Sequence, residues 1–331
     1  MRILVKRFIF AAKTPFVRVN TVRYCSSKQD DAPKKDDACE IKIEEILVEK
    51  YKGVTTLNID RQNTRNSLDE ATLREIGNAI EAFENDQKSV VLVINGEGGN
   101  FCSGFDVDEI DEKGYNTLKD ASSRLLRRPL CEKPTIAAVA GYAVGEGFEL
   151  ALACDLRVIE ETAVMGCLGR RFGLPQTMYG ARRLTSLIGL SPALDLLMTG
   201  RPINGKEAYA KGLACKLTAT GTALGESIKL AKSLVKFPQA ALIMDKLAAI
   251  GSQLNPNSEE SMRDEAVMQS LLGTAIEDLK VGIKKFQTGI GKHGKFHQLT
   301  EVPAKDWEME ESLEEMRVFG KYHKSKSEIT G

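Results

Sequence analysis

The residues best suited to chemistry in this sequence lie in a glycine-rich segment near the middle of the chain. An apolar, β-branched run from Thr135 to Val139 is typical of a buried strand. Gly141, Gly145 and Gly147 then lead into an Ala/Leu/Glu-rich segment with high helix propensity. A strand that enters a helix through glycines leaves backbone N–H groups accessible, and the helix N-terminus adds partial positive charge. The segment therefore predicts a site for an anion, either a phosphate or an oxyanion formed during a reaction.

A second glycine-rich segment, Gly96 to Gly104, follows another predicted buried strand at 89–95. If the two strands are neighbours in one sheet, the backbone N–H groups of Phe105 and Glu146 converge on one oxygen atom. Such an oxyanion hole stabilises an enolate or tetrahedral anion by about 2.7–4 kcal/mol per donor. Glu149 follows Glu146 by about one helical turn and is the candidate general acid or base.

The two glutamates allow more than one interpretation. Glu149 is also placed to complement the helix dipole as an acid in the first turn. We expect Glu146 to contribute its amide, with its side chain directed away from the hole. If its carboxylate instead lies close to that of Glu149, repulsion between the two raises one pKa toward neutrality.

Histidine is missing from the segment that carries these glycines. The three histidines are His293, His297 and His323, all near the C-terminus. A Ser-His-Asp hydrolase, a His-Glu-x-x-His metalloprotease or a His/Cys zinc site needs histidine in the core, so these classes are excluded and we expect no metal. The seven cysteines are scattered without Cys-x-x-Cys spacing, which is typical of reduced thiols.

A second reaction class has to be considered. The segment Gly141 to Gly147 also matches the Gly-x-x-x-Gly-x-Gly pattern of dinucleotide-binding proteins, and Tyr115 with Lys119 matches the Tyr-x-x-x-Lys of short-chain dehydrogenases. In those enzymes the glycine motif precedes the tyrosine, whereas here it follows. An NAD(P)-dependent short-chain dehydrogenase therefore remains the alternative of another class.

The elements that must position these residues alternate between strands and helices in the first half of the chain and are helical afterwards. We expect two short strands within 46–60 joined at Lys52-Gly53, a helix over 67–83 capped by Ser67, and helices from 237 to 296. Further elements are expected at 135–144 (strand), 147–154 (helix), 155–160 (strand), 178–197 (helix) and 205–212 (helix). The pattern predicts an α/β fold with a largely parallel, repeated ββα core and an appended helical region.

Several motifs together resemble the enoyl-CoA hydratase/isomerase (crotonase) superfamily. They are Asn58 to Leu68, with Gln62 where proline is usual, Phe101-Cys-Ser-Gly-Phe-Asp106, Lys133 to Asp155, and Leu197-Met-Thr-Gly-Arg-Pro-Ile203. The similarity covers roughly residues 42 to 297. It implies the crotonase fold, a spiral of ββα repeats with a C-terminal helical region.

The resemblance also implies a function. The substrate would be an acyl-CoA or enoyl-CoA thioester, whose carbonyl is held by the amides of Phe105 and Glu146 while Glu149 serves as general acid or base. Coenzyme A is then part of the substrate, so no separate cofactor is expected. The reaction would be that of a lyase or isomerase of fatty-acid β-oxidation, in a homotrimer or homohexamer assembled through C-terminal helices. The implied substrate-binding residues are Arg65, Ser67, Ser103, Gly104, Asp106, Val107, Asp108 and Gly145.

The sequence departs from the family pattern at two positions. Hydratases carry two glutamates that hold the water; the first matches Glu149, but the residue aligned with the second is Gly169. The middle glycine of the central motif is replaced by Glu146. A CoA-thioester-binding homologue with weak or no hydratase activity is therefore a further alternative.

Composition sets the domain organisation and location. The chain has 331 residues, and its first 28 contain seven basic residues and no acid. This is typical of a mitochondrial transit peptide and predicts the mitochondrial matrix; a disordered basic tail and a weak secretory signal are the alternatives. Without that segment 39 basic residues face 46 acidic ones, which argues against nucleic-acid binding. No apolar run is long enough to span a membrane.

The expected segments are 1–28 transit peptide, 29–41 linker, 42–237 ββα core, 238–297 helical oligomerisation region and 298–331 charged tail.

Overall fold

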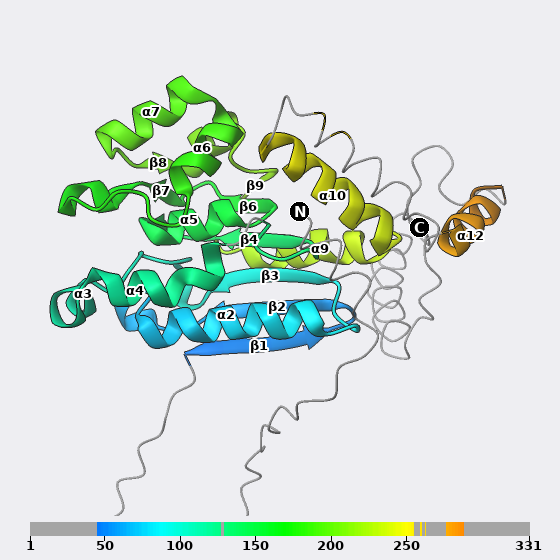
Figure 1. Ribbon diagram of the computed structural model, residues 1–331, viewed down its shortest axis with the longest axis horizontal. Helices are drawn as coiled ribbons and strands as arrows, with labels where there is room; N and C mark the ends of the chain where they lie inside the picture. Colours follow the sequence, from blue (N-terminus) through cyan, green and yellow to red (C-terminus); the bar gives the residue numbers. More distant parts are fainter. Residues whose placement is uncertain (1–44, 127–128, 255–258, 260–261, 263–275, 288–331) are drawn as a thin grey trace, which may run out of the picture. The chain divides into compact units, whose positions relative to one another are not determined.

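The computed structural model describes residues 45–126, 129–254, 259, 262 and 276–287 (Figure 1). The predicted transit peptide, linker and charged tail lie outside the described residues. Within the described residues, the family-like core and part of the predicted C-terminal helical region are present. The segment boundaries themselves remain predictions.

The main sheet has six strands in the order β1-β2-β3-β4-β6-β9. Only β1 and β2 are antiparallel, and the remaining pairs are parallel. The predicted hairpin at Lys52-Gly53 is confirmed, because both residues have positive φ (44° and 81°), as a tight two-residue turn between twisted strands requires. The strands are β1 (Ile46–Tyr51), β2 (Val54–Ile59), β3 (Val91–Gly96), β4 (Thr135–Val139), β6 (Leu156–Glu160) and β9 (Lys216–Thr218).

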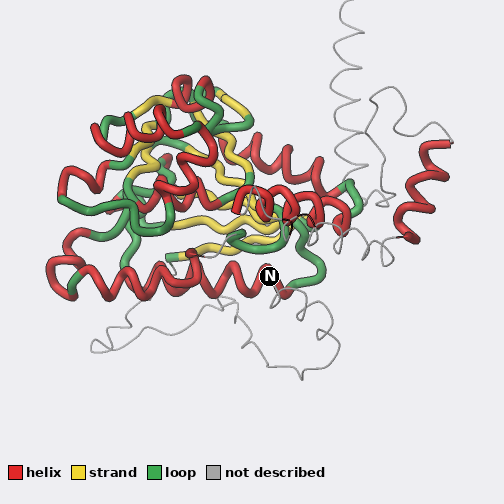
Figure 2. Tube along the Cα trace, turned by 45° about the horizontal axis from the view of Figure 1, so that its top comes forward, coloured by secondary structure: helices red, strands yellow, loops and turns green. Residues whose placement is uncertain are grey.

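Helices cover both faces of this sheet (Figure 1, Figure 2). Alternate residues of β3 point to opposite faces: Val91 and Val93 pack in the cluster that includes residues of α9 (Ala223–Val235), whereas Leu92 and Ile94 pack with residues of α2 (Glu70–Asn85). All four side chains are buried. A strand that is apolar on both faces reads as a continuous hydrophobic run, which is the pattern seen in the sequence.

The predicted ββα repeat is confirmed. Each repeat contributes one strand to the main sheet and one to a small sheet of order β5-β7-β8. The first repeat contains β4, β5 (Tyr142–Val144) and α5 (Glu146–Ala153); the second contains β6, β7 (Val164–Gly166) and α6 (Gly180–Ile188). The strand β8 (Ile203–Asn204) and α8 (Gly205–Ala210) then lead to β9.

The prediction of one strand over 135–144 was wrong. The chain breaks at Gly141, which has φ of 48°, so that β4 and β5 belong to different sheets. A Cβ at this position would lie 2.2 Å from the carbonyl oxygen of Gly99, so the close approach of two backbones requires glycine. Apolar composition alone does not reveal this bend.

Two predicted helices also differ in detail. The helix expected at 67–83 is α2, and its cap is Asp69, whose carboxylate accepts a hydrogen bond from the Thr72 amide. The helix expected at 178–197 is divided at Gly189, with φ of 81°, into α6 and α7 (Leu190–Thr199).

The remaining helices are α3 (Val107–Lys113), α4 (Tyr115–Ala121), α10 (Gln239–Leu254) and α12 (Ile276–Gln287). Short 3-10 turns occur at Gln62–Thr64, Glu97–Gly99, Ser122–Leu126 and Leu168–Phe172. In the part of the chain that is described, no helix is both long and apolar enough to cross a bilayer.

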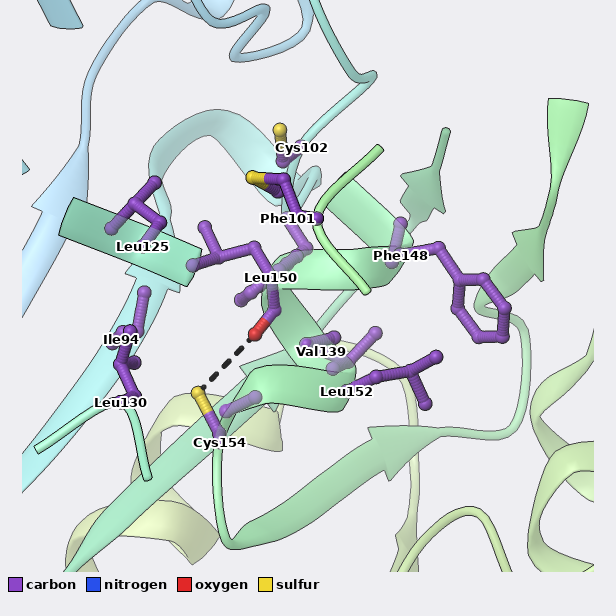
Figure 3. Close-up of a cluster of buried hydrophobic side chains, with 14 of the residues drawn as sticks. Ile94, Phe101, Cys102, Leu125, Leu130, Val139, Phe148, Leu150, Leu152 and Cys154 are labelled. Carbon is purple, nitrogen blue, oxygen red and sulfur yellow. Dashed lines mark hydrogen bonds between the residues drawn. The ribbon is translucent and has the colours of Figure 1, made fainter. Parts of the chain in front are cut away.

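Helix α5 lies inside the hydrophobic core. Phe148, Leu150 and Leu152 are buried among side chains from other elements (Figure 3). At its C-terminal end the thiol of Cys154 donates a hydrogen bond to the carbonyl oxygen of Leu150, 3.6 Å away. Because core side chains surround α5, the helix is held firmly in place. Its first turn carries Glu146 and Glu149.

Candidate active site

The two glycine-rich loops meet, as predicted from their neighbouring strands. β3 and β4 pair in parallel, and beyond them Cys102 forms a bridge with Ala143 of β5. The Cys102 amide donates to the carbonyl of Tyr142 at 2.8 Å, and the Val144 amide donates to the carbonyl of Cys102 at 3.1 Å. The N-terminus of α5 is therefore held directly beside the loop that contains Phe105.

Backbone pairing on the other side of this loop decides where the Phe105 amide points. The Leu68 amide donates to the carbonyl of Gly104 at 2.8 Å, and the Asp106 amide donates to the carbonyl of Leu68 at 3.0 Å. Because the N–H groups of successive residues in an extended segment point to opposite sides, the N–H of Phe105 faces away from Leu68 and toward α5. Gly104 has φ of 99°, a conformation that favours glycine.

The carboxylate of Glu146 occupies the position in front of this amide. The Phe105 N–H donates to Oε2 of Glu146 at 3.0 Å, and the backbone amide of Glu146 acts on the same carboxylate by lowering its pKa. The side chain is buried, with 4% exposure. The expectation that it points away from the hole was wrong, because a buried carboxylate needs hydrogen-bond donors and the Phe105 amide supplies one. Burial raises the pKa of Glu146, although the two amides oppose the shift.

Glu149 is fully buried, and three backbone amides bind its carboxylate. Met178 and Gly180 donate to Oε1 at 2.8 and 2.7 Å, and Thr177 donates to Oε2 at 2.9 Å. These amides lie at the N-terminus of α6, where unpaired N–H groups favour an anion. Burial raises the pKa of Glu149, the charge of Glu146 raises it further, and the amides lower it.

Two polar side chains that sequence reasoning did not assign to the site belong to it: Thr177 lies near both glutamates, and Tyr115 interacts with Thr177. The hydroxyl of Thr177 lies 3.5 Å from Oε1 of Glu146 and 3.4 Å from Oε2 of Glu149. The phenol of Tyr115 hydrogen-bonds Thr177, and burial raises its pKa, as do the charges of both glutamates. Tyr115 carried a signal only as part of a dehydrogenase pattern, and Thr177 carried none.

A cavity of about 250 Å³ opens beside the loop and the N-terminus of α5. Most of the predicted substrate-binding residues line it, but Arg65 and Gly104 do not, and neither does Glu149. Glu146 does line it, and so does Gly169, the position aligned with the second hydratase glutamate. The complete lining is Thr64, Ser67, Ser103, Phe105, Asp106, Val107, Asp108, Gly145, Glu146, Leu168, Gly169 and Leu174.

Arg61, which sequence reasoning did not single out, organises one edge of the cavity. Its Nη2 lies 3.0 Å from Asp69 and 3.2 Å from Asp106, and its Nη1 donates to the carbonyl of Ser67 at 2.7 Å. The Ser67 hydroxyl in turn donates to Asp106 at 2.9 Å. Burial raises the pKa of Asp106, but this bond, the Glu109 amide and Arg61 outweigh it and hold the pKa below its ordinary value. Asp106 also caps α3.

Ser103 and Arg65, two further predicted substrate-binding residues, lie next to this edge of the cavity. The Ser103 hydroxyl donates to the carbonyl of Thr64 at 2.9 Å. Arg65 adopts a left-handed conformation, with φ of 54°, and its guanidinium lies 5.2 Å from the centroid of the Tyr142 ring. The contact with the Tyr142 ring orients the guanidinium of Arg65, which keeps its positive charge.

Comparison with known proteins identifies a matching family, related sequences and a similar crystal structure. A family model described as enoyl-CoA hydratase/isomerase matches residues 49–288. A probable enoyl-CoA hydratase of Rhizobium meliloti is 32% identical over 246 residues, 73% of this chain and 95% of the relative. A probable mitochondrial enoyl-CoA hydratase of Dictyostelium discoideum is 33% identical over 71% of this chain and 84% of the relative. The crystal structure of an enoyl-CoA hydratase subunit I from Geobacillus kaustophilus aligns with a TM-score of 0.67 and 33% identity, covering 74% of this chain and 95% of that one.

Proposed function

The chain belongs to the enoyl-CoA hydratase/isomerase family, and on that basis we propose that it processes acyl-CoA thioesters through an enolate-like intermediate. The observation that carries the proposal is the Phe105 amide, which donates to a carboxylate oxygen of Glu146 at 3.0 Å; both residues line the cavity. An amide that binds a carboxylate oxygen is suited to bind the oxygen of an enolate.

In the hydratase form of the reaction, the oxygen of water adds to the β-carbon of an enoyl-CoA. The π electrons shift to the thioester oxygen, where the amides of Phe105 and Glu146 stabilise the negative charge. The general base takes the proton that the water loses, and a proton is then delivered to the α-carbon, which gives the 3-hydroxyacyl-CoA. In the isomerase form a proton leaves one carbon and returns to another through the same enolate.

We assign the role of general acid–base to Glu149. Its position on the first turn of α5 supports this role, and the raised pKa brings its protonation closer to neutral pH. Thr177 is the proposed link between Glu149 and the cavity, because its hydroxyl lies near both Glu149 and Glu146. The substrate-binding roles of Ser67, Ser103 and the segment 105–108 are part of the same proposal.

A panel of CoA thioesters tests this function. Crotonyl-CoA, a 3-hydroxyacyl-CoA and a malonyl-type thioester are each incubated with the purified protein, and their consumption is followed by absorbance and by mass spectrometry. We expect turnover of the enoyl or 3-hydroxyacyl thioester. A folded protein that binds none of the three would contradict the proposal.

The second candidate function is a CoA-thioester-binding protein that has lost turnover. Gly169 favours it, because this residue lines the cavity but offers no second carboxylate to hold water. Binding by calorimetry without consumption of any thioester in the panel would select this candidate.

The dehydrogenase alternative is not retained. The segment Gly141 to Gly147 follows β4 of the main sheet, contains β5 of the small sheet and ends in the first turn of α5, and the family that matches is not a dehydrogenase family. Tight binding of NADH without affinity for CoA would restore it.

We also propose the mitochondrial matrix as the location and a homotrimer or homohexamer as the assembly. The acid-free N-terminus and the mitochondrial relative of Dictyostelium discoideum support the location. An import assay with isolated mitochondria would show cleavage near the end of segment 1–28. Light scattering would give the mass of the assembly.

A further inference from the structure

We propose that the carboxylate of Glu146 is the resident ligand of the oxyanion hole, and that a thioester carbonyl binds there only by displacing it. This inference rests on the function proposed above and identifies Glu146 as a specificity-determining residue. It starts from the hydrogen bond that the Phe105 amide donates to Oε2 of Glu146 at 3.0 Å.

The Phe105 amide of the hole is already occupied by a carboxylate oxygen. Productive donors lie 2.7–3.1 Å from an oxyanion, and Oε2 already lies at that distance from Phe105. A Cβ placed on Gly104 would lie 3.0 Å from Oε2 and 3.4 Å from the Glu146 amide nitrogen. The carboxylate oxygen and the Glu146 amide nitrogen thus both lie against Gly104, and the same oxygen accepts the hydrogen bond of the adjacent Phe105 amide.

A carboxylate is a strong competitor for these amides. Hydrogen bonds to an ionised acceptor are roughly twice as strong as those to a neutral one. A ground-state thioester carbonyl is neutral and must therefore replace a better acceptor. The enolate that follows is anionic, so its hydrogen bonds to the two amides are again charge-assisted. Displacing the carboxylate therefore weakens binding of the thioester more than it weakens stabilisation of the enolate.

The surroundings dictate what happens to the displaced carboxylate. Among the described residues, three titratable groups interact electrostatically with Glu146. They are Glu149 of α5, Tyr115 of α4 and Cys102 of the loop after β3. Each of these is neutral or negative, and none offers a positive charge. Thr177 supplies a hydroxyl near Oε1.

Displacement therefore leads to protonation. Burial already raises the pKa of Glu146, and only the two amides oppose that shift together with Thr177. Once a carbonyl takes the amides, the carboxylate stays in the same negative surroundings without them, and its pKa rises further. Binding of a thioester therefore takes up protons from solvent at Glu146, and affinity falls as the pH rises.

The test compares two ligands that differ in the thioester carbonyl. Butyryl-CoA contains it and free CoA does not, and both are titrated into the full-length protein by calorimetry. We expect Glu146→Ala to raise the affinity for butyryl-CoA about ten-fold or more, because a charge-assisted bond no longer has to be broken. Affinity for free CoA should stay within about two-fold. The matched control is Glu112→Ala, an exposed glutamate of α3, for which both affinities should remain unchanged.

A second measurement does not depend on the alanine variant being well folded. Repeating the titration in buffers of different ionisation enthalpy counts the protons taken up on binding. Wild type should take up more protons with butyryl-CoA than with free CoA, and Glu146→Gln, which keeps the size of the side chain, should abolish that difference.

The outcomes separate this inference from the function it rests on. If folded wild type and variants bind neither free CoA nor butyryl-CoA, the proposed function fails and this inference fails with it. If they bind both but the ratio of affinities and the proton count are the same in all variants, the function stands and the displacement of Glu146 is overturned.

Discussion

The backbone amide of Gly180 lies 2.7 Å from Oε1 of Glu149, so the N-terminus of α6 binds a carboxylate carried by α5. The approach is possible because residue 180 has no side chain. A Cβ there would lie 2.5 Å from both Cγ and Oε1 of Glu149. The proposed general acid–base is therefore held in one orientation by a neighbouring helix, which is the kind of positioning that catalysis requires.

Gly180→Ala should disrupt this contact. The added methyl group forces Glu149 or α6 to move, and overpacking of this kind costs about 1–3 kcal/mol of unfolding free energy. Turnover of crotonyl-CoA should fall as the carboxylate leaves its position. Thermal unfolding and steady-state kinetics measure the two effects.

The control for that substitution is Gly225→Ala. Gly225 lies within α9 and no atom would meet its Cβ within 4 Å, so alanine should leave stability unchanged or raise it by up to about 1 kcal/mol. Equal stability of the two variants would show that Glu149 accommodates the methyl group without cost.

Glu149→Gln tests the acid–base role. General acid–base catalysis contributes about 10²–10⁴-fold to a rate, so we expect a loss of that size with nearly unchanged CoA affinity. The amide group would turn an N–H₂ donor toward amides that are also donors, so stability should fall by about 1–3 kcal/mol as well. Rates must therefore be measured well below the melting temperature of the variant. An active wild type whose rate survives the change would remove Glu149 from the mechanism.

Gly169→Glu restores the carboxylate that the family pattern places there. Position 169 lines the cavity, and a Cβ would lie 3.3 Å from Cβ of Leu174, which requires only a small adjustment. Hydration of crotonyl-CoA should increase, because the cavity then carries the carboxylate that holds water at this position in the family pattern. Gln87→Glu adds the same group at an exposed position outside the cavity and should have no effect. A rate that rises equally in both variants would point to overall charge instead of the site.

Arg61→Ala should weaken both the protein and the site. It removes the charge between Asp69 and Asp106 at a position where the arginine side chain is only 15% exposed. Breaking a buried ion pair from one side costs about 3–5 kcal/mol, and partial solvent access puts the expected loss at or below the lower end. The KM for the thioester should rise, since Ser67 and Asp106 line the cavity.

Arg74→Ala is the matched control, because Arg74 pairs with Glu70 on the exposed face of α2. Such a pair contributes about 0.3–0.5 kcal/mol. Chemical denaturation should therefore separate the two arginine variants by more than 1 kcal/mol, a margin that follows from these two ranges. If they lose the same stability, Arg61 does not organise the edge of the cavity.

The sequence by itself determined the core strands, the ββα repeat and the meeting of the two glycine-rich loops. These features follow from local rules: apolar runs form buried strands, and glycine appears where the backbone must turn or approach another chain segment closely. The amides of Phe105 and Glu146 could be named as partners for the same reason, because their positions depend on the backbone alone.

The tertiary structure decided where the side chains of that site point. Glu146 turns into the hole because the amide of Phe105, 41 residues away in sequence, donates a hydrogen bond to its carboxylate. Glu149 is bound by amides that begin 28 residues later at Thr177, and Arg61 reaches Asp106 across 45 residues. A buried charge takes whichever donors the folded chain brings within reach, and no local pattern encodes that choice.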